Sequence, residues 1–135
     1  ERNGIAYQIN TFMNSFYDVS SFGVYLSTNE NAMKKAQKLI LKEFDKIKSK
    51  KVSKIELMRA KEYIKGHVQM SLESTSNRMM RMGHSLLYYN KIKSLEESMN
   101  EIGSVSSDEI MEYSQKLFDP SNISSVLIAS KNLLN

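Results

Sequence analysis

Two short stretches near the start of the chain alternate between apolar and polar positions. In the first stretch, every second position belongs to the set Ile5, Tyr7, Ile9, Thr11 and Met13. Residues 14–21 are turn-prone, and residues 22–26 after them alternate again. A period of two is typical of β-strands, whose successive side chains point to opposite faces. The pattern therefore predicts an antiparallel hairpin.

A helical period follows the hairpin. Apolar side chains then recur at steps of three and four and form one stripe, which consists of Met33, Ala36, Ile40, Phe44 and Ile47. Asn29 can cap the first turn, because its side-chain oxygen can accept a hydrogen bond from a free backbone amide. We expect this helix to end near residues 49–51.

Three more helix starts carry the capping-box signature. In this motif a Ser side chain accepts a hydrogen bond from the third helical amide, while a Glu side chain accepts one from the Ser amide. The pairs are Ser53/Glu56, Ser94/Glu97 and Ser106/Glu109. We therefore expect helices to begin directly after residues 53, 94 and 106.

The remaining elements are placed by weaker signals. A further helix is expected after Ser76, and Pro120 should end the last helix, since proline lacks the amide and disfavours a helical residue before it. A final apolar strand is expected over residues 123–129. The helix after Ser76 should turn Met79, Leu86 and Leu87 inward.

This order of elements predicts an α+β fold. We expect one domain over residues 1–135, a two-layer sandwich in which helices pack on one face of an antiparallel sheet. Three strands make a thin sheet, and the chain begins at Glu1 without an initiator Met. We therefore expect it to be N-terminally truncated, with partner strands upstream of Glu1.

Composition is that of an ordinary globular protein. The chain has 135 residues, of which 41% are hydrophobic and 25% are charged, so we expect it to have a core of its own. The absence of Cys excludes a disulfide framework and a thiol nucleophile and agrees with a reducing, cytoplasmic location. No apolar run reaches 18 residues, so no membrane span is expected.

The positive charge is concentrated in one segment. Residues 34–65 contain 12 Lys or Arg and 4 Asp or Glu, a local net charge of +8 within a total of +4. Two interpretations are open, the solvated face of a helix and a Lys-rich anion-binding module. The first is favoured, and no nucleic-acid partner is expected, because aromatic and Arg side chains are not interleaved with the lysines.

Catalytic motifs are absent from the sequence. His67 and His84 lie on different expected helices without the spacing of metal ligands, and neither a G-x-S-x-G elbow nor a phosphate-binding glycine loop is present. The nine Met residues are interpreted as flexible core filler rather than as an adaptable binding surface.

Several motifs, in order and spacing, resemble the pitrilysin/insulinase-like zinc metallopeptidases, a family that includes mitochondrial processing peptidase. They are Arg2-Asn3-Gly4-Ile5-Ala6-Tyr7, Phe22-Gly23-Val24-Tyr25, Glu56-Leu57-Met58-Arg59-Ala60-Lys61 with Lys65-Gly66, Leu72-Glu73-Ser74 with Asn77-Arg78-Met79, Ser94-Leu95-Glu96-Glu97 and Phe118-Asp119-Pro120. Because they are collinear over nearly the whole chain, the match is specific.

The resemblance implies a role beside a zinc site. Members of this family are built from homologous halves, and this chain looks like the later part of the non-zinc half. It lacks the family's H-x-x-E-H, so zinc is expected in a partner half and not on this chain, which should be inactive alone. The implied partners are a zinc-bearing homologous domain or subunit and a peptide substrate.

One site residue is implied by the same resemblance. Tyr7 matches the family's tyrosine, which holds the substrate near the scissile carbonyl in an oxyanion-type role. The family's arginine stands seven positions earlier and falls before Glu1, and Arg2 is not its equivalent.

Two functions from different classes remain open. The first is the part of a zinc endopeptidase that closes over and orients an extended peptide. The alternative is a non-catalytic scaffold or partner subunit of the same family. In either case we expect a homo-oligomer or association with missing strands, because unpaired strand edges attract other strands.

Overall fold

The computed structural model describes residues 4–129. Their regular elements, in chain order, are β1 (Gln8–Ser15), β2 (Ser20–Ser27), a 3₁₀ turn η1 (Glu30–Ala32), α1 (Met33–Ser49), α2 (Lys54–Ser71), α3 (Thr75–Tyr89), α4 (Leu95–Ser104), α5 (Ser107–Leu117) and a 3₁₀ turn η2 (Pro120–Asn122). The predicted α+β class, with a hairpin followed by helices, is confirmed.

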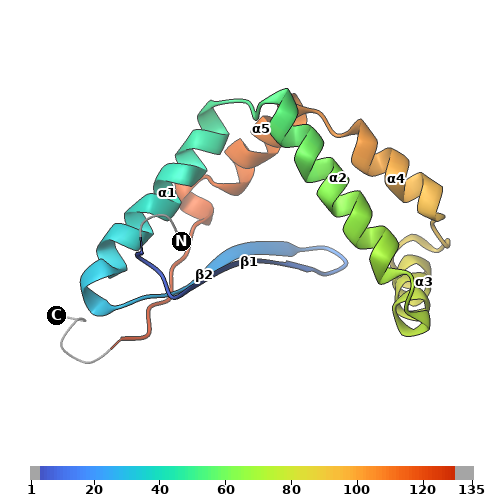
Figure 1. The fold of residues 1–135 in the computed structure, drawn as a ribbon, viewed down its shortest axis with the longest axis horizontal. Coiled ribbons are helices and arrows are strands. Elements are labelled where there is room, and N and C mark those ends of the chain that lie inside the picture. The colour runs from blue at the N-terminus through green and yellow to red at the C-terminus, as the bar shows by residue number, and fades with distance from the viewer. Residues whose placement is uncertain (1–3, 130–135) are drawn as a thin grey trace.

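The helices form an arch with the hairpin across its opening (Figure 1). Helices α1 and α5 pack together in one limb, and α2 and α4 pack together in the other, which ends in α3. Two short connectors, residues 50–53 and 105–106, meet at the apex, where Lys51 forms an ion pair with Asp108. The Nζ atom of Lys61 also donates to the carbonyl of Gly103 at 2.6 Å.

The hairpin is regular and has one chemically distinct face. Its strands pair antiparallel from Gln8 opposite Ser27 to Ser15 opposite Ser20. One face carries the apolar set Ile9, Met13, Phe22, Val24 and Leu26. The other carries mostly polar residues, together with Phe12, whose ring covers Gly23 so closely that an added Cβ would lie 2.2 Å from Cζ of that ring.

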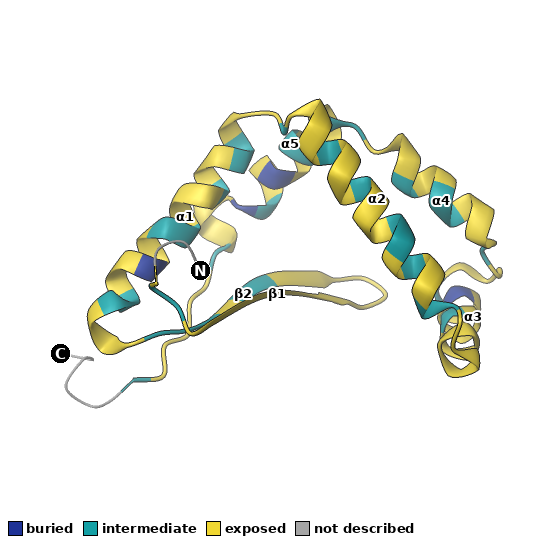
Figure 2. Cartoon of the chain, viewed as in Figure 1, coloured by how far each residue is buried: buried dark blue, intermediate teal, exposed yellow. Residues whose placement is uncertain are grey.

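An aromatic cluster joins the hairpin to the first limb. The rings of Phe44 on α1 and Phe118 after α5 stack with centroids 4.1 Å apart, and Phe22 of β2 meets the Phe118 ring edge-on at 5.7 Å. Phe118 is only 7% exposed, and Ala36 is buried close to the start of the same apolar stripe on α1. This cluster is the packing centre of the described residues (Figure 2).

The predicted helix boundaries agree closely with the structure. All three capping boxes are formed, at the N-termini of α2, α4 and α5. Asn29 caps η1, which leads directly into α1, and α1 ends at Ser49 as expected. Helix α3 begins at Thr75, slightly earlier than predicted, because Ser74 is its N-cap.

Three predictions about packing are wrong. Met79, Leu86 and Leu87 of α3, predicted to face inward, are exposed, since α3 stands at the end of the limb where too little packs against it. Among residues 4–129 the buried hydrophobic residues are Ala36 and Phe118 alone, so the expected core is very small. The methionines are also not core filler, because six of the nine are exposed: Met13, Met58, Met70, Met79, Met80 and Met82.

The predicted last strand is not formed either. Residues 123–129 have no regular secondary structure, and the sheet of the described residues contains only β1 and β2. A strand is defined by hydrogen bonds to a neighbouring strand, and none of the described strands pairs with this segment. Its apolar composition alone could not supply that neighbour.

Candidate functional site

Tyr7 stands immediately before β1, where the backbone is held by β2 and the residue after it. The amide of Tyr7 donates to the carbonyl oxygen of Ser27 at 2.8 Å. The hydroxyl of Thr28 donates to the carbonyl oxygen of Ile5, which lies two positions before Tyr7. The backbone around the candidate residue is therefore anchored from both sides, although Tyr7 lies outside the regular strand.

The pairing at Tyr7 departs from regular alternation. Ser27 is already the partner of Gln8 in the strand register, so the amide of Tyr7 bonds to a residue that faces the first residue of β1, and the chain bends at Tyr7. The regular alternation of side chains along β1 therefore does not extend to Tyr7.

The Tyr7 side chain projects into solvent. It is 79% exposed, and none of its neighbours within residues 4–129 is hydrogen bonded to its hydroxyl. A packed strand tyrosine would be covered by neighbouring side chains. The exposed phenol therefore has its donor available for a molecule outside the described residues.

The structure does not assemble a metal site around Tyr7. His67 on α2 and His84 on α3 are exposed; His67 meets the Tyr63 ring edge-on, and His84 stacks on Tyr88, each within its own helix. Residues 4–129 contain no group of three or more His, Asp or Glu side chains that could hold a metal ion. The described residues do not fit a zinc centre, and we derive no step through zinc bound to this chain.

Arg2 belongs to the same sequence motif as Tyr7. Arg2, which was not given a site role, lies outside the described residues.

The lysines of α1 occupy its polar face, and two of them, Lys46 and Lys48, pair with Glu43 and Asp45 of the same helix. Within the described part of the chain, no helix is long and apolar enough to cross a bilayer.

The sequence analysis did not identify one pair of arginines as a candidate site. Arg78 and Arg81 lie three residues apart on α3 and line one pocket together with residues of α2 and α4. The signal available was their helical spacing, since positions i and i+3 share a face. Arg78 was noted only as part of a family motif.

Comparisons with known proteins show what the chain is similar to. A family model described as the peptidase M16 inactive domain matches residues 1–64. An uncharacterized zinc protease of Bacillus subtilis, YmxG, is 28% identical over 133 residues, which are 98% of this chain and 32% of that protein. The beta subunit of mitochondrial-processing peptidase from Saccharomyces cerevisiae is 28% identical over 113 residues, 82% of this chain and 24% of the subunit.

A solved structure shows the same fold. A chain of complex III2 from Candida albicans, with Inz-5 bound, superposes with a TM-score of 0.72 at 20% sequence identity, covering 80% of this chain and 26% of that one. The predicted resemblance is therefore confirmed: the chain is similar to the M16 zinc proteases, and its first 64 residues match the inactive domain of that family. The chain spans about a third or less of these relatives.

Proposed function

We propose that this chain is part of a zinc-dependent endopeptidase, in which it closes over an extended peptide opposite a zinc-bearing homologous domain or subunit. The match of residues 1–64 to an inactive domain supports a partner role rather than a metal-binding one. Residues 1–135 then form part of a single non-zinc, substrate-binding domain. The observation that carries the proposal is the phenol of Tyr7, which is exposed at an anchored bend.

Tyr7 would act on the carbonyl of the scissile bond. Negative charge grows on that oxygen in the tetrahedral intermediate, and a phenol placed beside it can donate a hydrogen bond that strengthens as the charge develops. Zinc in the partner half would supply the activated water. The peptide would bind there as an added strand, and closure of this domain would exclude solvent and bring Tyr7 to the bond.

The test is Tyr7→Phe in the full-length zinc-bearing protein. Loss of one oxyanion donor should lower kcat/KM for peptide cleavage about a hundredfold, mostly through kcat. Tyr17→Phe is the matched control, because Tyr17 is similarly solvent-exposed, at 83%, but lies in the hairpin turn. The Tyr17→Phe protein should cleave peptides with unchanged kcat/KM.

Equal kcat/KM for the Tyr7→Phe and unsubstituted proteins would contradict the proposal. The alternative, a scaffold or partner subunit, predicts a different pattern. The zinc-loaded, assembled protein would then cleave no peptide in a broad mixture, while its two halves would still associate in sedimentation experiments.

A further inference from the structure

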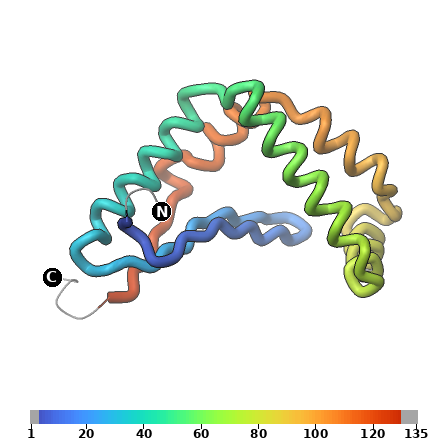
Figure 3. Tube along the Cα trace, viewed as in Figure 1, coloured from blue at the N-terminus to red at the C-terminus, as the bar shows by residue number. Residues whose placement is uncertain are grey.

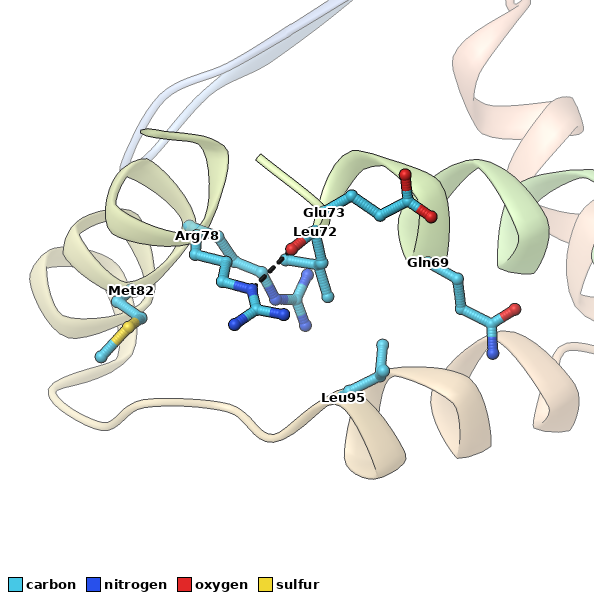
Figure 4. Close-up of a pocket in the computed structure, with 7 residues that line it drawn as sticks. Gln69, Leu72, Glu73, Arg78, Met82 and Leu95 are labelled. Atoms are coloured by element: carbon cyan, nitrogen blue, oxygen red, sulfur yellow. Dashed lines mark hydrogen bonds between the residues drawn. The ribbon is translucent and has the colours of Figure 1, made fainter. Parts of the chain in front are cut away.

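A pocket of about 370 Å³ lies where α2, α3 and α4 meet, in the limb far from the start of β1 (Figures 3 and 4). Its apolar wall consists of Leu72, the C-cap of α2, together with Met82 of α3 and Leu95 of α4. The polar lining consists of Gln69, Glu73, Arg78 and Arg81.

Both guanidinium groups are held by uncharged acceptors. Nε of Arg78 donates to the carbonyl oxygen of Leu72 at 2.5 Å (Figure 4). Arg81 donates to the hydroxyl of Ser98 on α4. These bonds fix the two groups in place without neutralising them. Neither arginine forms an ion pair with any residue in the range 4–129.

Most of the donors of this pair remain available. A guanidinium carries five N–H donors in a fixed plane, and the two bonds above use only one donor from each arginine. Glu73 is the one carboxylate that lines the pocket, so the lining carries two positive charges against one negative charge. Arg81 is also half-buried, which weakens the screening of its charge by water.

We propose that this pocket binds an acidic side chain of an extended peptide whose next side chain is apolar. The carboxylate would accept hydrogen bonds from Arg78 and Arg81, and the apolar side chain would pack on Leu72, Met82 and Leu95. A simple inorganic anion would use only the arginines, whereas an acidic and apolar pair uses the whole lining. The choice of a peptide as ligand rests on the proposed function.

A peptide held here and at Tyr7 would cross the opening of the arch, because the pocket lies in the limb of α2, α3 and α4 and β1 starts near the other limb (Figure 3). The pocket would then add a preference for an acidic residue at a fixed distance from the cleaved bond. It would do so without contact to the reacting atoms.

Fluorescence anisotropy on the 135-residue chain tests the inference, with a labelled peptide that contains Leu-Glu-Leu between blocked ends. Arg78→Gln and Arg81→Gln should each weaken binding about tenfold or more, since each removes a charge-assisted hydrogen bond. Arg59→Gln, at an exposed position of α2, should leave binding unchanged. Circular dichroism should show equal helix content in all variants.

A second set of variants separates binding from structure. Ser98→Ala removes the acceptor of Arg81 but keeps both charges, so it should weaken binding less than Arg81→Gln. The anisotropy assay reports peptide binding and the Tyr7→Phe assay above reports peptide cleavage, so that failure at this pocket and failure of the proposed function are distinguishable. Equal affinity of the Arg78→Gln or Arg81→Gln protein would overturn the inference.

The peptides themselves supply the remaining outcomes. A Leu-Gln-Leu peptide with a free C-terminal carboxylate should not bind, and equal binding of this peptide would overturn the assignment to an internal acidic side chain. Equal binding of a Gly-Glu-Gly peptide would overturn the role of the apolar wall. No binding of the Leu-Glu-Leu peptide at about 1 mM would reject the site altogether.

Discussion

Phe118 is the one buried ring of the aromatic cluster that it forms with Phe22 and Phe44. Its ring stacks on Phe44 of α1 and meets Phe22 of β2, so one residue joins the chain after α5 to the hairpin and to the first helix. The other limb has no comparable cluster among residues 4–129. Truncation of the Phe118 side chain should therefore destabilise the whole described fold.

The corresponding prediction is that Phe118→Ala will lower the free energy of unfolding by about 3–5 kcal/mol, the usual cost of truncating a buried Phe. This is a large share of the roughly 5–15 kcal/mol available to a natural domain. Urea unfolding followed by circular dichroism measures it. Tyr113→Ala, at an exposed position on α5, is the control and should cost less than about 0.5 kcal/mol.

At the scale of elements, the helix N-termini have a shared dependence on pH. Hydrogen bonds from Ser53, Ser94 and Ser106 hold the pKa values of Glu56, Glu97 and Glu109 below their ordinary value of 4.5. Each carboxylate accepts from the backbone amide of its Ser, at 2.7–3.1 Å. A lowered folded-state pKa means that the folded chain binds these protons less readily than the unfolded chain.

The sign of the effect follows directly. The contribution of these carboxylates to stability is fully present above the unfolded value of 4.5 and is lost as the pH falls through the lowered folded values. Helix content measured by circular dichroism should therefore fall on acidification below that value. The triple variant Glu56→Gln, Glu97→Gln and Glu109→Gln should flatten this response, because Gln keeps the capping hydrogen bond but does not titrate.

An unchanged acid response in the triple variant would assign the loss of helix to other carboxylates. A separate single variant, Ser106→Ala, should destabilise the protein at neutral pH by about 1 kcal/mol, since it removes the N-cap of α5.

The elements also show what can be predicted from sequence. Helix boundaries were predictable because a cap such as Ser53 with Glu56 is a signal within four residues. The absent strand at 123–129 and the exposed Leu87 were not, because both depend on which element lies alongside. Periodicity shows which residues share a face, but it does not show whether anything covers that face.

The candidate site divides in the same way. The assignment of Tyr7 came from a collinear family resemblance, and its role stays a prediction. The bend that exposes its ring depends on an irregular pairing with Ser27, which no local pattern encodes. The spacing of Arg78 and Arg81 on one helix could be seen in the sequence. The pocket that they line could not, because its wall includes Leu95 from another helix.

At the scale of the whole molecule, the apolar face of the hairpin has little cover. Every residue of β1 is exposed, including Ile9 and Met13 on this face, and β1 pairs only with β2 in the sheet that residues 4–129 form. Exposed apolar strands with an unpaired edge attract further strands. We therefore expect the 135-residue chain to self-associate as its concentration rises.

Sedimentation velocity tests this expectation. Met13→Lys places a charge on the apolar face and should lower the association markedly, whereas Asn14→Lys, on the polar face, should lower it less. A single monomeric species at every concentration of the unsubstituted chain would contradict the prediction.

The apex of the arch also sets how the limbs can move. Both connectors are only a few residues long and lie side by side, so a small rotation there tilts one limb while every helix stays intact. Helix α2 has 18 residues and is therefore about 27 Å long, so a tilt of about 10° would carry its far end roughly 5 Å. Substitutions at Lys51 or Asp108 would thus change the distance between the hairpin tip and α3, although both residues lie far from that place.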